Sequence, residues 1–205
     1  MSIPEEISKR LLHNICNLRD YRLNQTELAA LRNKHDEELW EEVGDILGKE
    51  FEEGGMFDAP RPNIFAILDV LDIRMQVYEF AGERALLKKF ENQFKLANNY
   101  SDQGGLGRKF ELYETLVSES FPLIKERDAE DQMHWFFTRA LNRLAQLTLY
   151  WKGEEKSRPL WMRLADHAME STEEEKLAIR DVIEDNATQF VISDHELFKL
   201  PTTCE

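Results

Sequence analysis

A dense group of acidic residues occupies HDEELWEEVGDILGKEFEEGG, positions 35–55, which holds nine carboxylates and one lysine. On a helix, Glu38, Glu42 and Asp45 fall at i, i+4 and i+7 on one face, with Glu41 beside them. Carboxylates grouped in this way attract basic side chains, or supply the oxygen ligands that Mg²⁺ and Mn²⁺ prefer. This acidic ridge (Glu38, Glu41, Glu42 and Asp45) is the first candidate site.

The C-terminal end of the ridge has the spacing of a known metal-binding element. Glu42-x-x-Asp45 in EEVGDIL resembles the ExxD element of the all-α nucleoside-triphosphate pyrophosphohydrolases, which hold Mg²⁺ between ExxD and an EExxE element on another helix. The resemblance implies a Mg²⁺-dependent nucleotide hydrolase, our third functional hypothesis. Here the only nearby EExxE, Glu37 to Glu41, overlaps the ExxD on the same helix and cannot face it across a cleft. We therefore expect no metal and no other cofactor.

The default interpretation of the ridge is an ordinary solvated helix face, because like charges at i, i+4 destabilise a helix by only about 0.2–0.5 kcal/mol per pair. The leading functional interpretation is a surface that binds a protein partner. Trp40 lies between the apolar and acidic faces, where a large aromatic side chain is a typical anchor for a partner. The first hypothesis is thus a cytoplasmic interaction or regulatory protein whose ridge and Trp40 bind a basic protein partner.

A second motif, RDAEDQMH at 127–134, points to a different chemistry. Its arginine and histidine resemble the R-x(4–6)-H pattern of the HEPN-type ribonucleases, all-α proteins that are usually dimeric. The resemblance implies metal-independent RNA cleavage, with Arg127 and His134 as catalytic residues. The structural alternative makes Asp128 a helix N-cap and lets His134 flank the apolar WFF segment. The ribonuclease is our second hypothesis.

The composition limits the class of partner and the cellular compartment. The net charge of −14 makes nucleic acid an unfavourable partner, because phosphate binding depends on clustered Lys and Arg. No apolar stretch reaches the roughly 20 residues that a membrane-spanning helix needs. Cys16 and Cys204 cannot form a disulfide framework and are not spaced as metal ligands. We therefore expect a cytoplasmic protein without a membrane segment.

The apolar spacing predicts an all-α protein, a single compact bundle of six to eight helices. One helix should span 36–53 and carry the ridge. Its predicted buried stripe consists of Leu39, Val43, Leu47 and Phe51. The segment 64–80 is apolar around most of its circumference, which predicts the central buried helix and a candidate homodimer surface. The loop 98–107 is a candidate sub-domain boundary within a single domain over 1–205.

The second half of the chain predicts four more helices. The first covers about 108–120 and should end near Pro122, and the next covers about 128–151. After a turn at 152–159, the third begins at Ser157 to Pro159. The fourth is capped by Ser171 or Thr172 together with Glu174 or Glu175.

Overall fold

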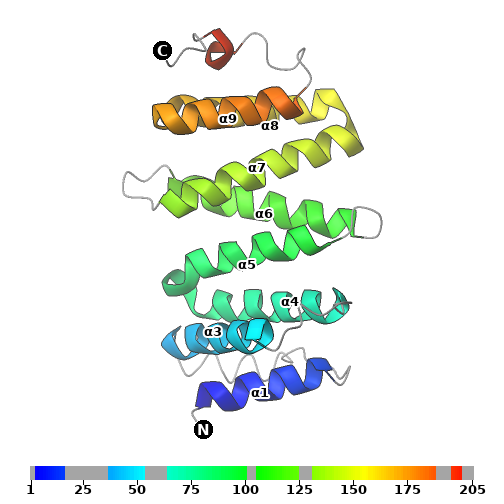
Figure 1. Ribbon diagram of the computed structural model, residues 1–205, viewed down its shortest axis with the longest axis vertical. Helices are drawn as coiled ribbons and strands as arrows, with labels where there is room; N and C mark the ends of the chain where they lie inside the picture. Colours follow the sequence, from blue (N-terminus) through cyan, green and yellow to red (C-terminus); the bar gives the residue numbers. More distant parts are fainter. Residues whose placement is uncertain are drawn as a thin grey trace. The chain divides into compact units, whose positions relative to one another are not determined.

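A computed structural model describes residues 3–16, 37–53, 64–100, 105–124, 131–187 and 195–199. Within these ranges the secondary structure consists of eight α-helices and two 3₁₀ helices, with no strand (Figure 1). The all-α prediction is therefore confirmed. In the described part of the chain, no helix combines the length and apolar character required to cross a membrane.

The chain divides into two compact units, an N-terminal unit, Met1–Lys109, and a C-terminal unit, Phe110–Glu205. The described helices up to the first turn of α6 are α1 (Ile3–Cys16), α3 (Glu37–Glu53), α4 (Ile64–Phe80), η1 (Gly82–Ala85) and α5 (Leu86–Asn99). They are followed by α6 (Leu106–Ile124), α7 (Asp131–Lys152), α8 (Glu154–Glu170), α9 (Glu173–Asn186) and η2 (Glu196–Lys199). The single domain over 1–205, with its candidate boundary in 98–107, stays a prediction.

Helix α4 is the central element of the N-terminal unit, as its sequence predicts. It packs against α1, α3, η1 and α5. Its buried side chains are Ala66, Ile67, Val70, Leu71, Ile73, Val77 and Tyr78. An apolar surface around most of the helix is stable only when neighbours cover several sides, and here they do.

Helix α3 is continuous, but its buried face differs from the predicted stripe. Trp40, Val43 and Leu47 are buried, whereas Leu39 is partly exposed. The buried line also includes Gly44 and Gly48, so it follows the i, i+3, i+4, i+7, i+8 pattern of a packed helix face. The prediction was wrong for Leu39 because two glycines belong to the core face, where a hydrophobicity pattern does not register them. The side chain of Phe51 lies outside the described residues.

Gly44 allows α3 to approach α4 closely, and we expect Gly44→Val to destabilise the N-terminal unit. A Cβ atom at this position would lie 2.8 Å from Cδ1 and Cζ of Tyr78, whose ring is fully buried. Overpacking of this kind costs about 1–3 kcal/mol. Gly107→Val is the matched control, since a Cβ at that helical glycine would meet nothing within 4 Å. Thermal unfolding followed by circular dichroism measures both, and equal stabilities would contradict the close approach.

The C-terminal unit is built from α7, α8, α9, η2 and the part of α6 that begins at Phe110. Helix α7 packs against α8 and α9, and α8 also contacts α9 and η2. The large side chains buried at their contacts include Phe137, Leu141, Leu144, Trp161, Leu164 and Ile183.

Two predicted helix boundaries in this half are corrected. Helix α6 continues through Pro122 to Ile124, because a proline in the last turn removes one backbone hydrogen bond without interrupting a long helix. Helix α8 begins at Glu154, where the sequence predicted a turn over 152–159. Gly153 alone reverses the chain, since its φ of 84° is a left-handed conformation that favours glycine.

The predicted cap of α9 is confirmed. Thr172 is the N-cap, and its side-chain oxygen accepts a hydrogen bond from the backbone N–H of Glu175. The Glu175 carboxylate in turn accepts from the backbone N–H of Thr172, which completes a capping box.

Candidate functional site

The acidic ridge lies on α3, and the exposure of its four carboxylates differs. Glu38 and Glu42 are exposed, and the Asp45 side chain is 47% exposed. The Glu41 side chain is only 18% exposed. The ridge therefore faces outward as predicted for most of its length, but Glu41 is largely covered by other residues.

Two basic residues from the next helices cover this part of the ridge. Arg84 of η1 donates a hydrogen bond from Nε to Glu41 and lies 3.7 Å from Glu38. Lys88 of α5 places its Nζ 2.8 Å from Glu41 Oε1 and 2.6 Å from Asp45 Oδ2. Within the described residues, Glu42 pairs with no basic side chain. Three of the four ridge carboxylates thus have an intramolecular counter-ion.

The ion pairs shift the pKa values of Glu41 and Lys88 in the direction that favours their charged forms. Hydrogen bonds from Lys88 and Arg84 hold the pKa of Glu41 below its usual range. Burial by itself lowers the pKa of Lys88, but hydrogen bonds to Asp45 and Glu41 outweigh it, so the pKa is raised. Both groups therefore remain charged at neutral pH, and the ion pairs persist.

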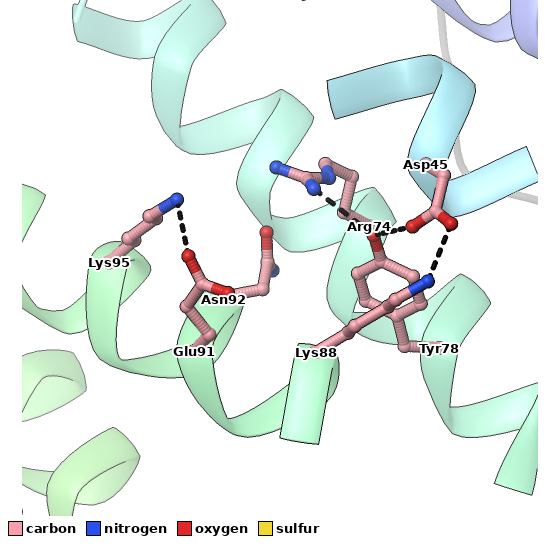
Figure 2. A pocket seen from close by; sticks show the side chains of 7 residues that line it. All are labelled: Asp45, Arg74, Tyr78, Lys88, Glu91, Asn92 and Lys95. Atoms are coloured by element: carbon pink, nitrogen blue, oxygen red, sulfur yellow. Dashed lines mark hydrogen bonds and ion pairs between the residues drawn. The ribbon is translucent and has the colours of Figure 1, made fainter. Parts of the chain in front are cut away.

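The ridge continues through Asp45 into a polar pocket of about 150 Å³, formed between α3, α4 and α5. Figure 2 shows the residues that line it: Asp45, Arg74, Tyr78, Lys88, Glu91, Asn92 and Lys95. Tyr78 donates a hydrogen bond of 3.0 Å from its hydroxyl to Asp45 Oδ1 and accepts one of 3.1 Å from Arg74 Nη2. Burial raises the pKa of Tyr78, so the phenol keeps the proton that it donates to Asp45.

The contacts of the ridge do not favour a metal ion. No group of three or more His, Cys, Asp or Glu residues in the described ranges could hold one. The position between Glu41 and Asp45, where a bridging cation would bind, is taken by the Lys88 ammonium group. The Mg²⁺-dependent hydrolase stays a hypothesis that rests on its sequence motif.

Trp40 is not part of the exposed surface. Its side chain is 3% exposed, and its ring packs at 5.4 Å from the ring of Phe80. A side chain covered in this way cannot insert into a partner unless the unit opens. Trp40 belongs to the core of the N-terminal unit, and we exclude it from the candidate surface.

The ribonuclease motif is described only in part. Arg127 lies outside the described residues. His134 lies on α7, is half-buried, and stacks on His167 of α8 with ring centroids 5.5 Å apart and planes 12° from parallel. Burial lowers the pKa of His167 to about 4, and the neighbouring His134 adds to the effect. The described contact of His134 is therefore a ring stack with His167, a histidine that is not part of the motif.

No motif in the sequence pointed to the residues that complete the pocket, namely Arg74, Tyr78, Lys88, Glu91, Asn92 and Lys95. One signal was available, because Arg74 is the only basic residue in the largely apolar segment 64–80, whose other charged residues are Asp69, Asp72 and Glu79. A lone arginine on a buried helix needs buried partners, and here it donates to the Gly44 carbonyl oxygen and the Tyr78 hydroxyl. The other residues carried no local signal.

Comparison with known proteins adds no relative to this picture. No protein-family model, no curated protein and no solved structure matches the chain. The two resemblances described above therefore rest on their motif residues alone.

Proposed function

We propose that this protein is a cytoplasmic interaction or regulatory protein that binds a basic segment of a partner protein through the acidic ridge. The observation that supports it best is the exposure of Glu38 and Glu42, the latter without a basic partner among the described residues. The net charge of −14 would add long-range attraction for a basic surface. Exposed charges of this kind mainly raise the association rate and the specificity of a complex.

Arg84 and Lys88 have a defined role in this proposal, as intramolecular competitors. Their side chains are 51% and 40% exposed, and solvent screening keeps ion pairs of such exposed side chains weak. A partner's arginine or lysine could therefore replace them at Glu41 and Asp45 at little cost. Binding would then favour a partner that presents several basic side chains over one that presents a single charge.

Charge reversal tests the proposal. Glu38→Lys with Glu42→Lys is expected to weaken binding of the basic partner at least about tenfold, because attraction is replaced by repulsion at two positions. The measurement compares the proteins that the wild-type and variant chains retain from an extract of the native cells, followed by titration of the retained protein at two salt concentrations.

The control for this experiment is Asp181→Lys with Asp185→Lys on α9. These two residues are exposed, have the same i, i+4 spacing and produce the same change in net charge. A basic protein retained by the wild type and by the control, but lost with the ridge variant, supports the proposal. Equal retention by both variants, or no basic protein retained by the wild type, contradicts it.

The other expectations from the sequence stay predictions. The ribonuclease with Arg127 and His134 and the Mg²⁺-dependent hydrolase have no further observation in their favour. The homodimer expected from the apolar segment 64–80 also stays a prediction.

A further inference from the structure

The pocket between α3, α4 and α5 has a buried floor and an exposed rim. Tyr78 and Asn92 are 1% and 2% exposed and form the floor. Asp45, Glu91 and Lys95 lie at the rim, with side chains about half exposed. Small ligands bind in concave sites of this kind, in which a few fixed polar groups determine their orientation.

Most charged groups of the pocket already have partners. Asp45 accepts hydrogen bonds from Lys88 and Tyr78, and Glu91 pairs with Lys95 at 2.8 Å. Arg74 differs, because no carboxylate in the described residues forms an ion pair with it. Its Nε and Nη2 donate to Gly44 and Tyr78, which leaves the Nη1 donors without a hydrogen bond in the described part of the chain. The pocket therefore contains a positive charge that a ligand's anionic group could pair with.

Asn92 provides a second atom without a hydrogen bond, an acceptor where Arg74 provides donors. Its Nδ2 donates to the Leu71 carbonyl oxygen, which fixes the orientation of the amide. Its Oδ1 is buried and accepts no hydrogen bond within the described residues. In Figure 2 the Asn92 side chain is turned toward the space between Arg74 and Lys95. A buried acceptor without a donor is unfavourable, so a donor that reaches it would bind.

We propose that this pocket binds a small carboxylic acid with a hydrogen-bond donor on the neighbouring carbon, that is, a 2-hydroxy or 2-amino acid. The carboxylate pairs with the Nη1 side of Arg74, a geometry for which a guanidinium group is well suited. The hydroxyl or amino group donates to Asn92 Oδ1. A pocket of about 150 Å³ requires these two functions to be close together on one small molecule. Lys95 at the rim adds attraction for the carboxylate.

Side-chain NMR of the full chain tests this site directly. The probes are L-lactate, acetate, which lacks the donor, and inorganic phosphate. We expect L-lactate to shift the Arg74 Nε–Hε and Asn92 Nδ2 resonances in a saturable manner, and acetate to bind at least about tenfold more weakly. The proposal is overturned by the absence of a saturable shift, by equal binding of acetate, or by binding of phosphate in place of L-lactate.

Two variants and one control assign the binding to the pocket. Arg74→Lys should abolish the L-lactate response, because the ammonium group cannot reproduce the guanidinium geometry. Lys95→Gln changes an exposed rim residue and should weaken binding severalfold with the fold intact. Lys156→Gln removes an exposed lysine of the C-terminal unit and should have no effect. Equal responses of Lys95→Gln and Lys156→Gln would overturn the site.

This ligand test is independent of the partner test under the proposed function. Glu38 and Glu42, which the partner test changes, do not line the pocket, so either proposal can fail without the other.

Discussion

Trp40→Ala is expected to lower the free energy of unfolding of the N-terminal unit by about 3–5 kcal/mol. The side chain is 3% exposed and packs on Phe80, so truncation removes a large buried apolar surface and leaves a cavity beside α4. A typical domain is stable by about 5–15 kcal/mol, so this loss would remove a large fraction of its stability. Urea denaturation followed by far-ultraviolet circular dichroism measures it, because the tryptophans that remain in the variant, Trp135, Trp151 and Trp161, all lie in the C-terminal unit.

Trp151→Ala is the matched control, because the Trp151 side chain is 52% exposed and the same truncation there removes little buried surface. We expect a change below about 1 kcal/mol. If Trp40→Ala were as stable as the wild type but lost the basic partner, Trp40 would be a surface anchor, as the sequence analysis proposed. Loss of stability in Trp40→Ala alone supports the position of Trp40 in the core.

Acidification is expected to destabilise the C-terminal unit through His167. The pKa of this histidine is about 4 in the folded protein, against an ordinary value of 6.5. Between these two pH values the unfolded chain binds a proton that the folded chain does not, so stability falls as the pH falls. Each pH unit contributes up to about 1.4 kcal/mol, which gives on the order of 3 kcal/mol between pH 6.5 and 4. Below pH 4 both states are protonated and the effect is complete.

His167→Leu isolates this contribution. The variant has no titratable group at the position, so the difference between its stability and that of the wild type should change with pH only between about 4 and 6.5. The pKa of Glu175 is lowered first by the hydrogen bonds of the Thr172 cap, which both proteins retain, so this main part of its contribution cancels in the difference. The smaller part that comes from the charge of His167 is removed together with that residue and belongs to the His167 effect. Denaturation curves at several pH values measure it. Parallel pH profiles of the two proteins would contradict the buried, neutral His167.

Local sequence determined the elements of this protein. The 3.6-residue spacing of apolar residues predicted the helices 36–53 and 64–80, and they are present as α3 and α4. Ser171 or Thr172, paired with Glu174 or Glu175, predicted the start of α9, and the pair that forms the capping box is Thr172 and Glu175, three positions apart. Signals of this range need no knowledge of distant contacts. These local signals were less accurate at Pro122, because the end of α6 depended on whether a long helix tolerates a proline in its last turn.

Only the tertiary structure decided which side chains of these helices are exposed to a partner or a ligand and which are buried. Whether Trp40 is core or surface depends on the rotation of α3, and the glycines at 44 and 48 set that rotation through contacts with Tyr78 and Arg74 of α4. The counter-ions of the ridge come from Arg84 and Lys88, more than forty positions along the chain from Glu41. The pocket likewise combines residues from three helices. The sequence of one helix shows where its charges lie along that helix. The electrostatic free energy of each charge also depends on neighbours from other helices, which only the fold brings within 4 Å.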